Sequence, residues 1–208
     1  MPAARESLLD AARTALTRKS WSRVRMVDVA AEAGVSRQTL YNEFGSKEGL
    51  ARALVRRETD SYLAGVDRAL AGPRDPRERL AAVAEWTVAS AGSNALVRAV
   101  LTGLWNRRLP APTLSAVPST SVVPAQRRAD GPLPAPGELF VLVRDRTLSA
   151  ICGPGTARSE AVEQARLCEL ALRLALSCLL VPPNTTGADG TAHLVRAALP
   201  RLVRQNVS

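Results

Sequence analysis

Residues 26–50 constrain the fold of this chain more than any other stretch. Apolar residues recur at helical spacing over Val27–Ala33, which predicts a first short helix. Gly34 then suits the positive φ that often ends a helix. Ser36 is a favourable N-cap residue for a second helix, which we expect to begin at about Arg37. The pattern therefore predicts a helix-turn-helix.

The second predicted helix has an apolar side and a polar side. Leu40 and Phe44 lie four residues apart and share the apolar face. Gly45 ends the helix, and Ser46 caps a third one. The remaining faces carry side chains that can form hydrogen bonds: Arg37, Gln38, Thr39, Tyr41 and Asn42.

These polar residue types are suited to contact with DNA. Gln38 can pair with an adenine edge, Arg37 with a guanine or a phosphate, and Thr39 can touch a thymine methyl group. Tyr41 and Lys47 can bond phosphate oxygens. We expect phosphate contacts to set the position and Gln38 to read the sequence. The alternative is a solvated polar helix on an all-α protein without DNA binding.

The same stretch resembles the TetR family of transcriptional regulators over about residues 5–55. The resemblance rests on Val29-Ala30, Ala33-Gly34-Val35-Ser36, Thr39-Leu40-Tyr41, Phe44, Ser46-Lys47-Glu48 and Leu50. It implies that the helix over Ser36–Phe44 enters the major groove of DNA. It also implies that Tyr41 and Lys47 hold the phosphate backbone.

Two positions depart from the family pattern. The first motif helix starts with Arg25 and Met26, where members often have threonines, so the usual hydroxyl cap is missing although Arg25 can contact a phosphate. Gln38 stands where many members have glycine, which suggests a target sequence of its own. The predicted DNA-binding residues are Arg25, Ser36, Arg37, Gln38, Thr39, Tyr41, Asn42 and Lys47.

Composition and charge narrow the class of protein. The chain has 208 residues, 46% of them hydrophobic, which is ample for a helical core. Its longest apolar candidate, Leu170–Val181, is interrupted by Arg173, so we expect no membrane span and a cytoplasmic protein. A net charge of +9 favours polyanionic partners.

Metal, cofactor and enzyme signatures are missing from the sequence. Cys152, Cys168 and Cys178 lack metal-ligand spacing, and we expect buried apolar thiols, with redox sensing as the alternative. His193 is the only histidine, and there is no phosphate-binding glycine loop or nucleophile elbow. We therefore expect no metal, no cofactor and no enzyme activity.

The helical patterns predict an all-α protein of two domains. Residues 1–50 would form a three-helix helix-turn-helix DNA-binding domain, and residues 51–208 a larger C-terminal helical domain for ligand binding and dimerisation. Residues 110–136 hold seven prolines and are predicted to be a surface loop, or alternatively a flap over a cavity. The other predicted helices are 6–17, 47–70, 76–91, 95–109, 137–152, 159–181 and 191–204.

The helix predicted over 159–181 is apolar on nearly every side, so it needs cover from more than one direction. An intramolecular core pair would supply it, but we favour a homodimer built from the last two long helices. Two copies related by a two-fold axis can read a palindrome whose half-sites are about 34 Å apart.

The family resemblance further implies a pocket for a small-molecule effector among residues 76–91, 95–109 and 137–152. Its predicted wall is Trp86, Trp105 and Phe140, with Thr102, Asn106 and Arg144 as polar groups. Each of these could instead belong to the core. The predicted function is a ligand-responsive repressor that binds a palindromic operator as a homodimer. The alternatives are a ligand-independent DNA-binding or architectural protein and, less favoured, a helical enzyme.

Overall fold

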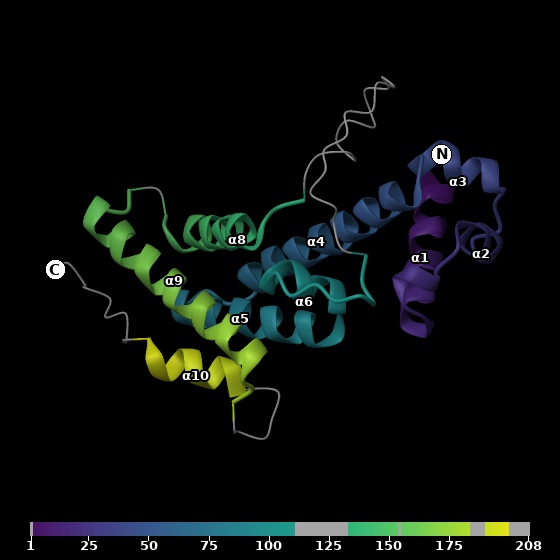
Figure 1. The fold of residues 1–208 in the computed structure, drawn as a ribbon. Helices are drawn as coiled ribbons and strands as arrows, with labels where there is room; N and C mark the ends of the chain where they lie inside the picture. The colour runs from purple at the N-terminus through teal and green to yellow at the C-terminus, as the bar shows by residue number, and fades with distance from the viewer. Residues whose placement is uncertain (1, 111–132, 154, 184–189, 200–208) are drawn as a thin grey trace. The chain divides into compact units, whose positions relative to one another are not determined.

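The computed structural model describes residues 2–110, 133–153, 155–183 and 190–199, and every regular element in these ranges is helical (Figure 1). This confirms the all-α prediction. The chain divides into two compact units, one of residues 1–59 with 104–134 and one of residues 60–103 with 135–208. The α4 helix, Lys47–Ala71, contributes residues to both.

The first unit contains α1 (Pro2–Arg18), the short 3-10 helix η1 (Trp21–Arg23), α2 (Met26–Glu32), α3 (Arg37–Phe44) and the start of α4. The sequence pattern does not predict η1. The α1 helix packs against both α2 and α3. The most deeply buried side chains of the first unit are each at most 2% exposed and include Leu8, Leu9, Ala12, Val24, Val29, Leu40, Leu50 and Leu54.

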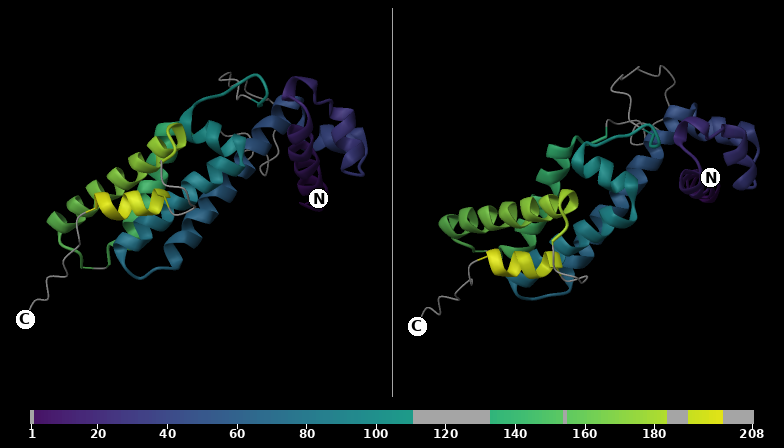
Figure 2. Two further views of the ribbon diagram at one scale, coloured as in Figure 1. Left: turned by 90° about the horizontal axis from the view of Figure 1, so that it is seen from below. Right: turned by 60° about the horizontal axis from the view of Figure 1, so that its bottom comes forward.

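The second unit contains the end of α4 with α5 (Pro76–Ser93), α6 (Ala95–Thr102), α8 (Pro136–Ile151), α9 (Arg158–Leu180) and α10 (Gly190–Ala198). The α5 helix packs against α9 and α10, and α8 packs against α9 (Figure 2). Small apolar residues allow this close packing, and the cluster between α5, α9 and α10 is Leu80, Ala81, Ala84, Leu167, Cys168, Ala171, Ala175, Ala192, Val195 and Leu199.

Side-chain caps set the start of two helices in this unit. Asp75 Oδ1 accepts hydrogen bonds from the backbone N–H groups of Arg77 and Glu78, and Pro76 occupies the first turn of α5. Asn94 Oδ1 accepts from the N–H of Leu96 at 3.0 Å. The sequence predicts that the helix over 76–91 ends before Gly92, but α5 continues to Ser93, and Asn94 alone both ends α5 and begins α6.

The prediction of a helix over Ala95–Leu109 is wrong beyond Thr102. Gly103 adopts a left-handed conformation with φ +72°, and residues 103–110 are not helical. Leu104 and Trp105 extend the apolar period past this end, so periodicity alone overestimates the helix length.

Two other predictions fall partly on residues that the structure does not describe. Of the proline-rich segment 110–136, residues 111–132 lie outside them, and Pro136 is already the first residue of α8. The last predicted helix, 191–204, corresponds to α10, which ends at Ala198, and residues 200–208 lie outside the description.

Candidate nucleic-acid interface

The turn between α2 and α3 depends on the backbone conformation of Gly34. Its φ is +67°, and the N–H of Val35 donates to the carbonyl of Ala30 at 3.0 Å. A Cβ at Gly34 would meet no atom within 4 Å, so there is room for a side chain at this position. Glycine is required here because it tolerates a positive φ. The turn directs the chain into α3 after only four residues, 33–36.

Ser36 fixes the first turn of α3. Its Oγ accepts a hydrogen bond from the N–H of Thr39 at 3.0 Å and lies 2.8 Å from Thr39 Oγ1. On the inner side, Leu40 is 0% and Phe44 9% exposed. Because this side is buried, α3 presents its opposite, polar side outward.

Three of the predicted DNA-binding residues of α3, Arg37, Gln38 and Asn42, are exposed. Gln38 Nε2 donates to Asn42 Oδ1 at 2.8 Å. The bond uses one of the two amide hydrogens of Gln38, so the second hydrogen and Oε1 retain the pattern that a bidentate adenine contact requires. The guanidinium of Arg37 lies 5.3 Å from the ring centre of half-buried Tyr41, within cation–π distance.

Lys47 begins α4 and is half-buried. Its Nζ donates to the carbonyl of Ser22 at 3.3 Å and lies 5.4 Å from the ring centre of Trp21. Burial lowers the pKa of the Lys47 ammonium, and the neighbouring carboxylate of Glu48 acts in the opposite direction. Ser46 accepts from the N–H of Gly49 at 3.1 Å and so fixes the first turn of α4.

Arg25 stands at the N-cap of α2 but forms no side-chain cap. It pairs instead with Asp28, with 3.2 Å between its guanidinium and Oδ1, while its side chain stays 75% exposed. Lys19, which is not among the predicted DNA-binding residues, donates to Asp28 Oδ2 at 2.9 Å. Hydrogen bonds from Lys19 and then Arg25 hold the pKa of Asp28 below its ordinary value.

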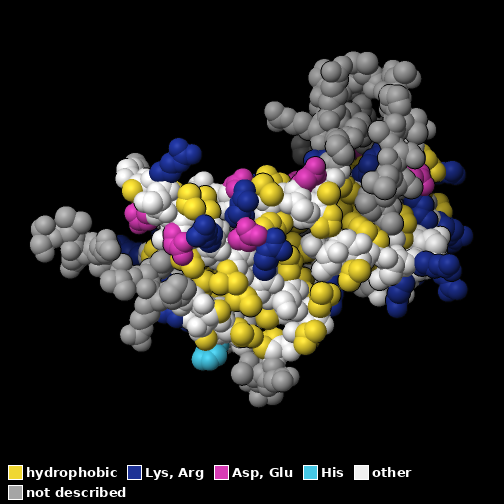
Figure 3. Space-filling model, turned by 60° about the vertical axis from the view of Figure 1, so that its left-hand side comes forward, with side chains coloured by type: hydrophobic (Ala, Val, Ile, Leu, Met, Phe, Trp, Pro, Cys, Tyr) yellow, Lys and Arg dark blue, Asp and Glu magenta, His cyan; other side chains and the backbone are white. Residues whose placement is uncertain are grey.

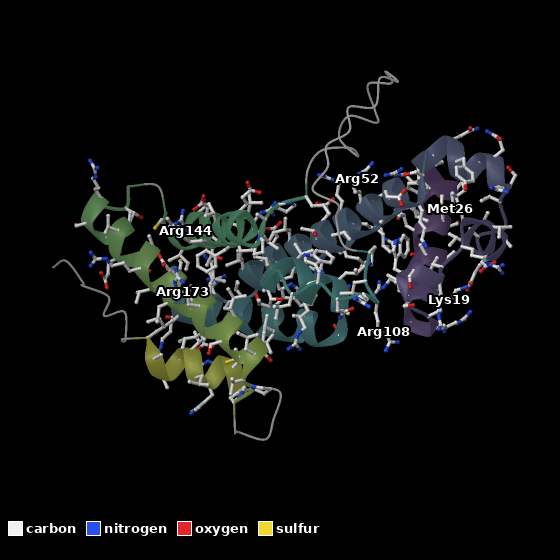
Figure 4. The ribbon with its side chains drawn as sticks, viewed as in Figure 1. Lys19, Met26, Arg52, Arg108, Arg144 and Arg173 are labelled. Carbon is white, nitrogen blue, oxygen red and sulfur yellow. The ribbon has the colours of Figure 1, made fainter. Side chains whose placement is uncertain are left out.

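Basic side chains gather over the first unit, at the right-hand edge of Figure 3, while acidic and basic side chains alternate over the second unit. The exposed cations of the first unit include Arg18, Arg23 and Arg25. Figure 4 labels Lys19 and Met26, which lie before and at the start of α2.

The second unit has an open groove of about 680 Å³ between the end of α4, the start of α5, and α8. Charged residues Asp67, Arg79, Asp145 and Arg146 line much of it. None of the six predicted ligand-binding residues lines this groove. Trp86 instead donates its indole N–H to the carbonyl of Tyr62 at 3.0 Å, which places it in the packing between α4 and α5.

The other predicted ligand-binding residues have contacts of their own. Phe140 lies under the guanidinium of Arg173, 5.4 Å from its ring centre; Arg173 and Arg144 are labelled in Figure 4. Arg144 pairs with Asp145 at 2.8 Å. Thr102 donates to a backbone carbonyl one turn earlier in α6. Trp105 and Asn106 belong to the first unit, so the six residues do not fall in one unit.

The described ranges hold no group of three or more His, Cys, Asp or Glu side chains placed to hold a metal ion. Among these same residues, no helix has the length and apolar character needed to cross a membrane. Cys168 and Cys178 are buried, as expected, and Cys152 is half-buried.

Comparison with known proteins connects this fold and interface to a family. The profile described as bacterial regulatory proteins, tetR family, matches residues 8–54. The HTH-type transcriptional regulator AlkX of Mycobacterium tuberculosis is 32% identical over 205 residues, which span 98% of this chain and 87% of that protein.

Two solved structures share the fold. The TetR family repressor AlkX from Dietzia sp., implicated in biodegradation of n-alkanes, matches with a TM-score of 0.52 and 23% identity over 92% of this chain and 93% of that one. AibR in complex with isovaleryl coenzyme A and operator DNA matches with a TM-score of 0.50 and 18% identity over 95% and 97%. On its similarity to the mycobacterial regulator over nearly the whole chain, this protein belongs to the TetR family of bacterial transcriptional regulators.

Proposed function

We propose that this protein is a repressor that binds a palindromic operator as a homodimer through α3 and releases it when a small molecule binds the second unit. The observation that carries the DNA-binding part is the division of α3 into a buried side, Leu40 and Phe44, and an exposed side with Arg37, Gln38 and Asn42. Repression is supported by the relative AlkX, which is a repressor, and binding of a small-molecule effector by the relative AibR, whose structure holds isovaleryl coenzyme A together with operator DNA.

The proposed roles follow from residue chemistry. Gln38 reads a base edge, and Asn42 supports it through the hydrogen bond between their side chains. Tyr41 and Lys47 bind phosphates on either side of the groove. Arg25 and Arg37 add charge contacts, and Ser36 and Thr39 offer hydroxyl groups at the N-terminus of α3. We assign residues 1–50 to DNA binding and residues 51–208 to dimerisation and ligand binding, in the cytoplasm.

The proposed dimer uses α9 and α10. Five of the nine exposed large hydrophobic residues in the described ranges lie on α9, directly after it, or on α10, namely Val162, Leu170, Leu180, Val181 and Leu194. An apolar surface of this kind on a regulator favours an interface with a second copy. Figure 3 shows hydrophobic side chains gathered on the face of the second unit turned toward the viewer.

The proposed effector binds the second unit, where Trp86, Thr102, Phe140 and Arg144 remain candidate contacts. Isovaleryl coenzyme A and n-alkanes are the compounds named with the two structural relatives, and they are the first probes to use. Release of a fluorescent operator from the protein, followed by anisotropy, would identify an effector. A compound that binds the protein without releasing the operator would not be one.

The DNA interface is tested with an operator selected from genomic DNA by the purified protein. The substitution Gln38→Ala should reduce the preference for this operator over a scrambled duplex about tenfold, because a bidentate base contact contributes about 1–3 kcal/mol. The substitution Lys47→Ala should weaken both duplexes alike and reduce the slope of log K against log salt by about one per subunit.

Arg74→Ala is the matched control, because Arg74 is an exposed cation of the second unit. It should change neither the preference nor the salt slope. If Gln38→Ala and Lys47→Ala both bind the selected operator like the unmodified protein at low and high salt, the interface is assigned to the wrong residues.

A further inference from the structure

The short helix η1 lies between two parts of the first unit that are distant in sequence. On one side, Lys47 Nζ donates to the carbonyl of Ser22 and faces the ring of Trp21. On the other side, the backbone N–H of Trp21 donates to the carbonyl of Arg108 at 2.8 Å. Arg108 is labelled in Figure 4. One residue, Trp21, therefore contacts both the start of α4 and the segment that follows α6.

The contacts of Lys47 restrict its position without using up its bonding capacity. An ammonium group has three hydrogens, and the carbonyl of Ser22 takes one. The remaining two can donate to a phosphate. A lysine side chain that is already held loses less conformational entropy when it binds its partner. The lowered pKa of Lys47 agrees with an ammonium partly covered by the Trp21 ring.

Trp21 is held in turn by a compact turn after α6. Asn106 Oδ1 accepts from the N–H of Arg108 at 2.9 Å, and the Asn106 carbonyl accepts from the N–H of Leu109 at 3.0 Å. These bonds orient the Arg108 carbonyl toward Trp21. Only residues 104–107 separate Arg108 from Gly103, where the chain leaves the second unit. The carbonyl that binds Trp21 therefore belongs to a turn that is itself closed by two hydrogen bonds.

We propose that Trp21 is a positioning residue that holds Lys47 for its contact with the phosphate backbone, and that the turn at residues 106–109 anchors Trp21. The inference rests on the proposed function, in which Lys47 binds DNA. It adds a supporting contact from η1 to the lysine at the start of α4.

The first test uses no DNA. Lys19 and Lys47 are the only lysines, so protein labelled with 13C at lysine Cε gives two lysine side-chain signals in an NMR titration, assigned with Lys47→Arg. The substitution Trp21→Ala should raise the pKa of Lys47 toward its ordinary value of 10.5, because the ring no longer covers it. Trp21→Phe keeps an aromatic ring and should keep the pKa lowered.

The turn is tested by Asn106→Ala, with Asn106→Asp as its control because aspartate retains an oxygen that can accept from the N–H of Arg108. The alanine variant should raise the pKa of Lys47 in the same direction as Trp21→Ala, and the aspartate variant should leave it lowered. If the Lys47 signal titrates identically in Trp21→Ala, Asn106→Ala and the unmodified protein, the positioning role is overturned.

The second test measures operator affinity in a double-mutant cycle. Trp21→Ala should weaken binding three- to tenfold, Trp21→Phe should recover most of the loss, and Trp21→Ala should cost nothing further once Lys47 is alanine. Additive losses would overturn the proposal. If Lys47→Ala itself leaves DNA binding unchanged while Trp21→Ala still moves the Lys47 pKa, the DNA interface fails but the positioning contact stands.

Discussion

Gly49, in the first turn of α4, approaches the carbonyl oxygen of Phe44 so closely that a Cβ at Gly49 would lie 1.9 Å from that oxygen. Phe44 is the last residue of α3, so this contact fixes the end of the proposed recognition helix against α4. The Phe44 oxygen is a backbone atom and a Cβ is bonded directly to the backbone, so neither atom can move aside without displacing its helix.

The substitution Gly49→Ala should therefore displace α3 from α4. We expect a loss of about 1–3 kcal/mol in the free energy of unfolding, typical of overpacking, with a parallel loss of operator affinity. Urea unfolding and anisotropy measure the two effects. Gly92→Ala is the control, since a Cβ there meets nothing within 4 Å in α5, and alanine in a helix should be neutral or add about 0.5–1 kcal/mol. Equal effects of the two changes would contradict the steric argument.

Two substitutions of Ser36 can distinguish its role as the N-cap of α3 from its proposed role in DNA contact. Ser36→Ala removes the acceptor for the N–H of Thr39 and should cost about 1 kcal/mol of stability. Ser36→Asp keeps a capping oxygen, so thermal unfolding should stay near that of the unmodified protein. Its negative charge would nevertheless face the proposed phosphates and should weaken operator binding. If Ser36→Asp is as unstable as Ser36→Ala, the cap is not what stabilises this turn.

The second unit should lose stability at high pH because of Tyr62. Its hydroxyl lies 3.0 Å from Thr87 Oγ1, and burial raises its pKa to about 12. The unfolded chain releases this proton near pH 10 while the folded chain keeps it, so stability is full below pH 10 and falls as pH rises from 10 toward 12. At about 1.4 kcal/mol for each pH unit, the loss approaches roughly 3 kcal/mol.

Urea unfolding across this pH range should show a shallower loss for Tyr62→Phe, which has no proton to release. Tyr41→Phe is the matched control, because Tyr62 and Tyr41 are the only two tyrosines, and it should keep the pH dependence. The same steep loss in Tyr62→Phe would mean that other groups cause the alkaline unfolding.

Local signals made the helix-turn-helix predictable from sequence. A cap or a positive-φ glycine acts on residues within about four positions, so Gly34, Ser36 and Gly45 can be interpreted without tertiary information. All three behave as expected, with Gly45 at φ +69° ending α3. The start of α3 at Arg37 is likewise confirmed.

Features that depend on distant partners could not be predicted. The contact between Trp21 and Arg108 joins segments more than eighty residues apart, and no local pattern announces it. The roles of the predicted ligand-binding residues were inferred by resemblance, and Trp86 turned out to fill the space beside Gly65, where a Cβ would lie 2.0 Å from its ring. The predicted length of α6 was wrong for a different reason, because apolar residues continue past Gly103, where the helix has already ended.

The proposed dimer makes a final prediction about α9. Val162 and Leu180 are 50% and 61% exposed and lie eighteen residues apart, which is five helical turns, so they share one side of α9. Glutamate at both positions should bury charge in the interface and shift a dimer toward the 22.1 kDa monomer in sedimentation velocity. Operator binding should weaken in parallel, since the two α3 helices would no longer be held together. Val141→Glu on α8, 41% exposed, is the control and should stay dimeric. Dissociation by Val141→Glu but not by the α9 changes would place the interface on α8 instead.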